Sequence, residues 1–204
     1  MAITSLSNLS VPLASDQSSS SQGLLMPKLA YRFRVMFHNF GVSTPTTELT
    51  KQVANAGRPS VSFEDINIPV YNSVVKLQGK HAWEDITVSL RDDATGVVSK
   101  LIGEQLQKQF DFYEQASANA GGDYKFSMTL EILDGGNGAY VPVVLESWEL
   151  YGCYVKSAKY SEMGYDKNET MTIELTIRFD NALQSPTGTG VGTAVGRGLS
   201  TVAI

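Results

Sequence analysis

A run near the C-terminal end of the chain alternates apolar and polar side chains without a fault. Every second residue between positions 171 and 179 is apolar, and the residues between them are polar: Met171, Ile173, Leu175, Ile177 and Phe179 against Thr172, Glu174, Thr176 and Arg178. Successive side chains of a β-strand point to opposite faces, so the pattern predicts a strand with one buried face. A helical period does not fit it. Other strands of the chain must pair with this one.

The segment before this run is predicted to be the neighbouring strand. Residues 148–155 are rich in aromatic and β-branched side chains, and Gly152 interrupts them where a bulge or a close backbone approach is expected. A polar loop, residues 156–169, joins the two strands. Further strands are predicted over residues 31–37, 60–70 (with a bulge at Glu64 and Asp65), 124–133 and 139–145, and residues 38–58 are expected to be loop.

A hairpin and one helix are predicted in the middle of the chain. Residues 71–79 and 83–90 are expected to form the two arms of the hairpin, with its turn near residues 78–81. Apolar residues recur at spacings of three and four over about residues 96–118, which predicts a helix with N-cap candidates at Asp92, Asp93 and Thr95. The fold class is therefore mainly β, a β-barrel or two-sheet structure with one flanking helix and no repeated βα units.

The distribution of charge divides the chain into three parts. We expect a serine-rich N-terminal arm over residues 1–30, a β domain over residues 31–184 and a Gly/Thr-rich C-terminal arm over residues 185–204. The 204 residues, 42% of them apolar, are enough for one sizeable core. Both arms are nearly uncharged but contain apolar residues, which gain stability only when they are buried. We therefore expect residues 1–27 or 185–204, or both, to become ordered only against neighbouring subunits; the alternative for residues 1–27 is a disordered tail.

The overall charge and the cysteine content restrict the partners and the compartment. The formal net charge is −5, from 21 acidic and 16 basic side chains, which argues against a surface that grips nucleic-acid phosphates. The one cysteine excludes a disulfide within the chain and suits a reducing compartment. No apolar run approaches the length that spans a bilayer, and no cleaved signal sequence is expected.

The chain offers little catalytic material, and we predict that it is not an enzyme and takes no cofactor or metal ion. His38 and His81 lie near predicted turns, where surface positions are expected. Cys153 is expected to be a buried, inert thiol, and Trp83 and Trp148 are expected to belong to the core. One alternative from another class remains open, a small-ligand-binding β-barrel or a hydrolytic enzyme. It requires an interior cavity with converging polar groups.

Two collinear blocks of the sequence resemble the tail tube proteins of contractile-tailed bacteriophages. In the first block, an aliphatic-Pro stretch leads into an extended hairpin and a Gly. An aromatic residue with acidic neighbours, a Thr-containing strand and an Asp turn follow before the helix. The matching residues, in this order, are Ile68, Pro69, Gly79, Trp83, Glu84, Asp85, Ile86, Thr87, Val88, Asp92 and Asp93. The second block runs from Trp148 to Tyr154, then through Tyr165, Asp166 and Glu169 into the closing strand at Phe179 and Asp180. Together the blocks span most of residues 57–181, and the two arms lie outside the pattern.

The resemblance implies a structural virion protein that forms hexameric rings stacked into a hollow inner tail tube. The implied partners are further copies of the chain, the tail sheath protein, the tape measure protein, and the baseplate and tail terminator proteins. DNA passes through the lumen without specific binding, so we expect a lumen wall that is neutral or net negative. Assembly in the host cytoplasm and location in the virion follow from the same resemblance. The inner-tube protein of type VI secretion shares the fold and is the alternative within this class.

The hairpin is the predicted contact between rings. We expect it to project from the β domain and to bury its apolar residues against the adjacent ring, because a lone hairpin is marginal in water. Main-chain pairing across an exposed edge would add strength to this contact. The predicted interface residues are Tyr71, Asn72, Val74, Val75, Lys76, Leu77 and Gln78.

Overall fold

The computed structural model describes residues 28–42, 46–134 and 142–186. The chain divides into two units, residues 1–32 and residues 33–204. The first unit is described only from Lys28 to Arg32, where the backbone N–H of Arg32 donates to the carbonyl oxygen of Leu29 at 3.1 Å. The predicted terminal arms, 1–30 and 185–204, fall almost entirely outside the described residues.

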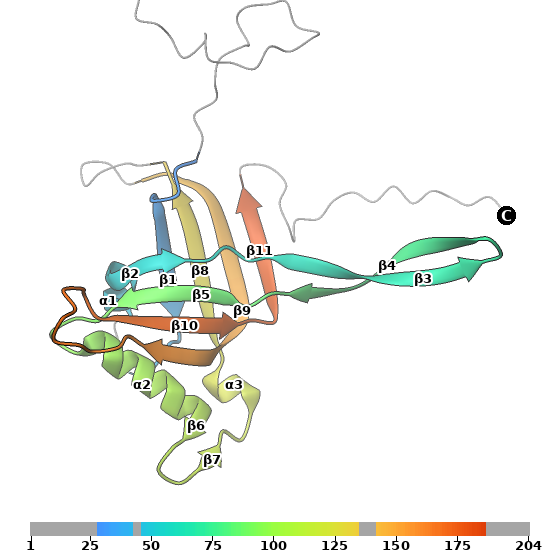
Figure 1. Cartoon of the computed structure of the whole chain (residues 1–204). Coiled ribbons are helices and arrows are strands. Elements are labelled where there is room, and N and C mark those ends of the chain that lie inside the picture. Colours follow the sequence, from blue (N-terminus) through green and yellow to red (C-terminus); the bar gives the residue numbers. More distant parts are fainter. Residues whose placement is uncertain (1–27, 43–45, 135–141, 187–204) are drawn as a thin grey trace, which may run out of the picture. The chain divides into compact units, whose positions relative to one another are not determined.

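The described part of the second unit contains eleven strands and three helices, and strands predominate, as the sequence predicts (Figure 1). In chain order these are β1 (Phe33–His38), α1 (Thr47–Gln52), β2 (Val53–Ala56), β3 (Val61–Val70), β4 (Ser73–Trp83), β5 (Ile86–Arg91), α2 (Val97–Gln109), β6 (Phe110–Asp111), β7 (Ala116–Ser117), α3 (Gly121–Tyr124), β8 (Phe126–Leu133), β9 (Val144–Tyr160), β10 (Thr172–Arg178) and β11 (Asn181–Pro186).

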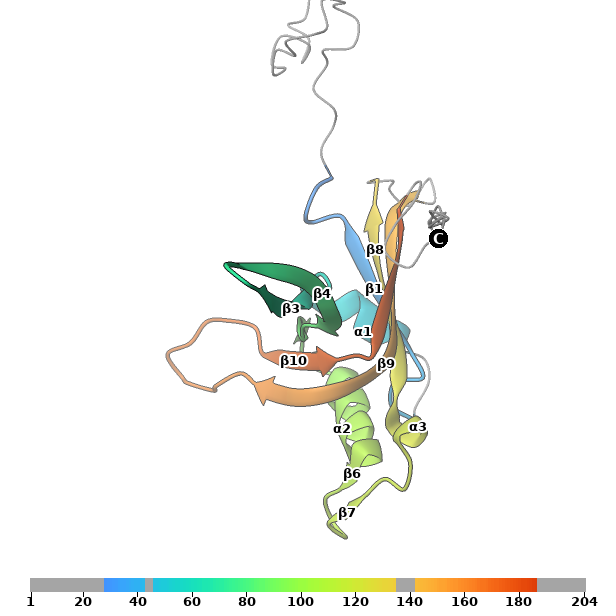
Figure 2. The same cartoon turned by 90° about the vertical axis from the view of Figure 1, so that its right-hand side faces the viewer.

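The long strand β9 takes part in two sheets. Its first half pairs with β8 and β11, and β8 pairs with β1; we call these four strands sheet A. Its second half pairs with β10, which pairs with β5, which pairs with β2; we call these four sheet B. All pairs are antiparallel, and the two sheets run in different directions (Figure 2). Within the described residues the sheets are open and form no closed barrel, so the two-sheet form of the prediction is the one observed.

Gly152 lies where β9 passes from one sheet to the other. β9 has one extra residue in a bulge here, because Tyr151 and Gly152 lie opposite Ser127 alone, between the pairs Cys153–Phe126 and Leu150–Met128. Gly152 has a φ of 67°, and a Cβ atom there would collide with the carboxylate of Asp180. Glycine is the residue that adopts this backbone conformation without cost. The sequence predicts a bulge or a close backbone approach at this glycine; the bulge is confirmed, and the close approach there is made by the side chain of Asp180.

One hydrophobic core holds the two sheets and the helices together. The core residues alternate along the strands as the sequence predicts: Ile173, Leu175, Ile177 and Phe179 are all buried, and so are Trp83, Trp148 and Cys153. Burial raises the pKa of the Cys153 thiol to about 12, so this thiol stays protonated and inert at neutral pH. The predictions for these three side chains are confirmed.

Two glutamine side chains of α2 form hydrogen bonds with the backbone of neighbouring segments. Gln105, which the sequence places within the apolar stripe, is fully buried; it accepts from the Gly41 N–H at 3.0 Å and donates to the Tyr124 carbonyl at 2.7 Å. Gln109 donates to the carbonyl of Val155 and accepts from its N–H, both at 2.8 Å. Its side chain therefore bonds to the β9 backbone much as a neighbouring strand would. No helix in the described part of the chain is long and apolar enough to cross a membrane.

Several predicted boundaries are wrong. The helix ends at Gln109 and not near 118, because Phe110 takes an extended backbone conformation and starts β6. Residues 47–56 form α1 and β2 where loop was expected. The predicted strand at 139–145 lies partly outside the described residues, and its last two residues already belong to β9, which continues to Tyr160 and shortens the expected 156–169 loop. The terminal strand β11 was not predicted.

Gly152 and Gly103 provide a matched test of the fold. We expect Gly152→Ala to lower the free energy of unfolding by about 1–3 kcal/mol, because the new Cβ meets Asp180 on a left-handed backbone. Gly103 lies within α2 with open space around its Cβ position, so Gly103→Ala is expected to be neutral or stabilising by up to about 1 kcal/mol. Denaturant unfolding of both variants measures the difference, and equal stabilities would contradict the role given to Gly152.

Candidate assembly interface

Strands β3 and β4 form a hairpin, residues 61–83, that extends beyond the end of sheet B (Figure 1). The chain enters it from β2 and leaves it into β5, and these two strands are themselves paired in sheet B. At its root, the Gly57 N–H donates to the Thr87 carbonyl at 2.8 Å and the Glu84 N–H to the Ser60 carbonyl at 2.9 Å. The hairpin is thus a continuation of paired strands past the core.

The turn of the hairpin differs from the prediction. Val70 pairs with Ser73, so the turn consists of Tyr71 and Asn72, and the predicted turn at residues 78–81 lies inside β4. Gly79 serves a different purpose there, because a Cβ atom at this position would lie 2.8 Å from the carbonyl oxygen of Glu64. The register shifts between Phe63 and Asp65, so a bulge lies at the predicted position, but its extra residue is on β4, where Gly79 and Lys80 lie opposite Glu64 alone. The glycine therefore permits a close approach at a bulge, and the strand paired with β4 is β3 rather than residues 83–90.

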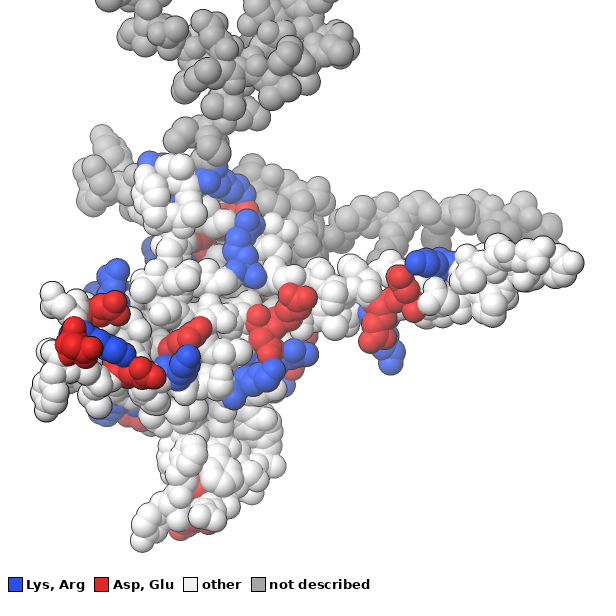
Figure 3. All heavy atoms as spheres, viewed as in Figure 1, with Lys and Arg blue, Asp and Glu red and all other residues white. Residues whose placement is uncertain are grey.

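Beyond the bulge, the two faces of the hairpin differ in polarity. Cross-strand partners share a face, and faces alternate along each strand. Apart from Ser73, one face consists of apolar side chains that are 42–51% exposed: Ile66, Ile68, Val70, Val75 and Leu77. The opposite face carries the polar Asp65, Asn67, Lys76 and Gln78 together with Pro69 and Val74, and Lys76 and Asp65 are 3.9 Å apart. In Figure 3 the far end of the hairpin shows no charged side chain.

In a single chain, the side chains of the apolar face remain half exposed to water and contribute only part of their possible burial energy. Burying a large aliphatic side chain fully stabilises by about 1.5–3 kcal/mol, so covering the exposed half of each of these five would contribute about 1 kcal/mol apiece. No other element of the described chain covers them, as their exposure shows. A surface of this kind marks an interaction site.

The tip of the hairpin holds a strained aromatic residue. Tyr71 is fully exposed and has a φ of 45°, a region that bulky residues rarely adopt and that costs about 1 kcal/mol or more. The Ser73 hydroxyl donates to the Val70 carbonyl across the turn at 3.3 Å. The turn is therefore held in one conformation that presents the phenol ring outward.

The seven predicted interface residues all lie in this hairpin, but they divide between its surfaces. Tyr71 and Asn72 form the tip, Val75 and Leu77 belong to the apolar face, and Val74, Lys76 and Gln78 belong to the other face. The prediction missed Ile66, Ile68 and Val70, which complete the apolar face from β3. Their alternation after the bulge at residues 64–65 was the signal that could have placed them with Val75 and Leu77.

An ion-pair cluster fixes the root of the hairpin to sheet B. Asp85, between β4 and β5, binds Lys156 of β9 at 2.5 Å and Arg178 of β10 at 2.7 Å. The hydrogen bond from Lys156, followed by that from Arg178, lowers the pKa of Asp85, and the bond to Asp85 raises the pKa of Arg178. The connection between β4 and β5 is thus joined to β9 and β10 at the point where the hairpin leaves the sheet.

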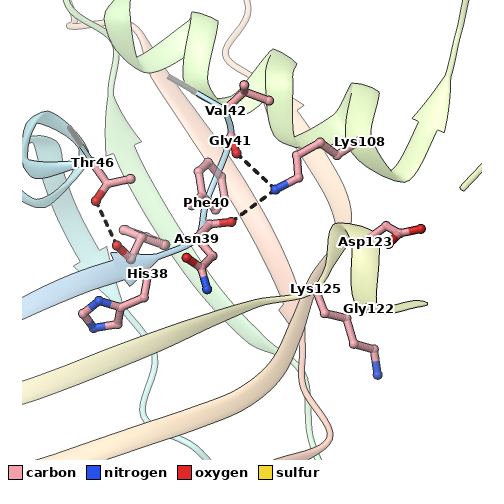
Figure 4. A pocket seen from close by; sticks show the side chains of 11 residues that line it. His38, Asn39, Phe40, Gly41, Val42, Thr46, Lys108, Gly122, Asp123 and Lys125 are labelled. Carbon is pink, nitrogen blue, oxygen red and sulfur yellow. Dashed lines mark hydrogen bonds between the residues drawn. The ribbon is translucent and has the colours of Figure 1, made fainter. Parts of the chain in front are cut away.

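A surface hollow of about 580 Å³ lies between the loop after β1 and the C-terminal end of α2 (Figure 4). Lys108 donates to the carbonyl oxygens of Asn39 at 3.3 Å and Gly41 at 3.1 Å, and Thr46 donates to the Phe37 carbonyl at 2.9 Å. These polar groups bind the protein's own loop, so the hollow gives no support to the ligand-binding alternative. Across the described ranges, no three His, Cys, Asp or Glu side chains are placed to hold a metal ion, and His38 and His81 are exposed.

Solved structures of tail tubes and contractile injection systems share this fold. A chain from the cryo-EM structure of the anti-feeding prophage cap, the tube-terminating cap, matches with a TM-score of 0.60 and 15% identity, over 86% of this chain and 99% of that one. A chain from the sheath/tube terminator of the PVC extracellular contractile injection system matches with a TM-score of 0.56 and 15% identity, over 80% and 99%. The SPP1 tail tube matches with a TM-score of 0.51 and 13% identity, over 78% and 80%. No known protein family and no curated protein matches the sequence. The chain therefore has the tail-tube fold, as its sequence suggested.

Asp85 makes the stability of the folded chain dependent on pH. Its folded pKa lies below the unfolded value of about 3.9, so its contribution is present above about pH 4 and is lost as the pH falls through the folded pKa. We expect Asp85→Asn to lose about 1 kcal/mol or less at pH 7, since both cationic partners are partly exposed. The difference from the parent protein should shrink on acidification, as measured by thermal unfolding between pH 7 and pH 3. A difference that grows towards low pH would contradict this assignment.

Proposed function

We propose that this protein is the structural subunit of the inner tube of a contractile tail, and that it is not an enzyme. The single observation that carries the proposal is the hairpin: a chain with the tail-tube fold extends an apolar face that nothing in its own described structure covers. Copies of the chain supply the cover, assembling into hexameric rings that stack into a tube. The hairpin, with the predicted residues 71–78, forms part of the contact between rings.

The partners follow from the same proposal. A tube of this kind is enclosed by a sheath protein, starts on a baseplate, ends at a terminator and contains a tape measure protein before its cargo. In a bacteriophage the cargo is DNA, delivered into the host from a virion assembled in the host cytoplasm. Support for a contractile system comes from the similarity to structures of sheath, baseplate and tube assemblies. A tube that carries another cargo, as in the alternative based on type VI secretion, keeps the same subunit contacts.

We infer that the open face of sheet A lines the lumen. Its outward residues are mostly hydroxyl, amide and apolar side chains, and its charged groups are Arg34, Glu131 and Glu149, which gives a net charge of −1. Arg34 is paired with Glu131 through two hydrogen bonds of 2.8 and 2.5 Å. The open face of sheet B carries Arg91, Lys159 and Arg178 against Glu174 along its strands, a net charge of +2, and therefore favours phosphates more than sheet A does, although Arg178 is paired with Asp85.

The net charge of the proposed lumen wall predicts how strongly assembled protein binds DNA. Assembled protein should bind duplex DNA weakly, with little dependence on salt between about 50 and 200 mM, because few cations face the lumen to release counterions from DNA. Fluorescence anisotropy with a labelled duplex measures this. Tight binding at low salt that falls steeply with added salt would count against the sheet A assignment.

The hairpin face is tested by charge substitution. We expect Val75→Asp or Leu77→Asp to leave the subunit folded, because both side chains lie outside the core, and to weaken association at least about 100-fold by burying an unpaired carboxylate. Asn67→Asp, on the opposite face of the same hairpin, is the matched control and should assemble normally. Circular dichroism reports folding, and sedimentation with negative-stain microscopy reports rings and tubes. A folded Val75→Asp protein that still forms long tubes would remove this face from the interface.

A further inference from the structure

The hairpin and the β9–β10 connection lie at opposite ends of sheet B. Ile86, next to the hairpin, pairs with Ile177 at the end of β10, whereas Arg91 at the other end of β5 pairs with Thr172 at the start of β10. The residues that join β9 to β10, 161–171, must therefore lie at the end of the sheet that is remote from the hairpin. Figure 1 shows the hairpin leaving one end of the sheet and this connection turning at the other.

The remote end of sheet B exposes large apolar and aromatic side chains, and the charged Glu162, Asp166, Lys167 and Glu169 lie between them. Its large side chains are Tyr160, Met163, Tyr165 and Met171, and they range from 48% exposed to fully exposed. Methionine and tyrosine are well suited to packing against an aliphatic surface, because the thioether adapts its shape and the phenol adds a polar tip.

Hydrogen bonds hold this surface in shape. The Ser161 N–H donates to the Thr172 carbonyl at 3.0 Å, and the Thr172 N–H donates to the Ser161 hydroxyl at 3.1 Å. Within the connection, the Lys167 N–H donates to the Gly164 carbonyl at 3.1 Å and the Lys167 ammonium binds Glu162 at 3.0 Å. A surface that is ordered before binding loses less entropy when a partner covers it.

We propose that this end of one copy, residues 160–171, receives the apolar face of the hairpin of the next copy. A tube is built from heterologous contacts, in which two different patches of the same chain meet and the contact repeats without closing on a pair. The hairpin face and the remote end of sheet B are two such patches, and their placement at opposite ends of one sheet makes the contact head-to-tail. This inference rests on the proposed function, since it names the surface that the hairpin contacts in a neighbouring subunit.

A second group of exposed aromatic side chains on the same chain is the alternative surface for the hairpin of a neighbouring copy. The β6–β7 turn presents Phe110, Phe112 and Tyr113, which are 37%, 62% and 94% exposed. Asp111 orders this turn by accepting from the backbone N–H groups of Tyr113 and Glu114. It follows α2 rather than a strand of sheet B, so it lacks the end-to-end relation to the hairpin that a repeating contact along the sheet uses. It therefore provides the comparison for the test.

Cysteine crosslinking between copies tests the contact. The native Cys153 is fully buried and does not need to be removed. Full-length proteins carrying Val75→Cys, Met163→Cys or both are allowed to assemble and are then oxidised under mild conditions. We expect an equal mixture of the two single variants to give a covalent dimer, and the double variant to give a ladder of multimers on a non-reducing gel. The comparison protein combines Val75→Cys with Tyr113→Cys.

Each outcome decides between surfaces. A ladder from the Val75/Met163 pair and none from the Val75/Tyr113 pair supports the proposal. The reverse pattern, or no ladder from either pair although microscopy shows normal rings and tubes, overturns it and leaves the proposed function intact. Parent protein that stays monomeric at every concentration overturns the proposed function, and this inference with it.

Discussion

The structure depends on one strand that belongs to two sheets. β9 carries the backbone pairing of sheet A over its first half and of sheet B over its second half, so a single segment couples almost every strand of the core. The change of direction is concentrated at a bulge, where Gly152 takes a left-handed conformation and the Asp180 carboxylate occupies the space that a side chain would need. That carboxylate also binds Lys125 at 2.5 Å and raises the pKa of that ammonium group, which ties the start of β8 to the end of β10.

The core includes only the root of the hairpin, at Trp83 and Val61, so the part beyond the bulge is free for contact. The strands of the hairpin continue β2 and β5, so their direction is set by sheet B, and Asp85 anchors the root to two further strands. An isolated two-stranded ribbon has little stability of its own in water. The position of the hairpin is thus determined by the folded domain, whereas its apolar face remains available to a neighbouring molecule. The side chains that stabilise the fold and those that stay exposed on the hairpin thus lie in different parts of the chain.

Local patterns in the sequence predicted most of the core and the part of the hairpin's apolar face that lies on β4, Val75 and Leu77. The alternation of apolar and polar residues was sufficient to predict β10 and β5, because a strand that is buried on one face has an apolar residue at every second position. The helix was overextended because Phe110 and Tyr113 continue its spacing, and spacing alone does not reveal that these rings face solvent. The hairpin turn was misplaced because Gly79 and Lys80 resemble a turn more closely than Tyr71 and Asn72 do. Which strand pairs with which depends on contacts distant in sequence, so the pairing of β3 with β4, and with it the register of the apolar face, came from the structure.

The amide of Gln109 has a consequence for the single folded chain. Beyond the end of β8, the edge of β9 has a backbone N–H and a carbonyl at Val155 with which another strand could pair. Open strand edges of this kind allow proteins to aggregate by edge-to-edge pairing. The glutamine occupies both the N–H and the carbonyl there. A foreign strand must first displace it, so newly made chains at high concentration are guarded against irregular aggregation at this edge.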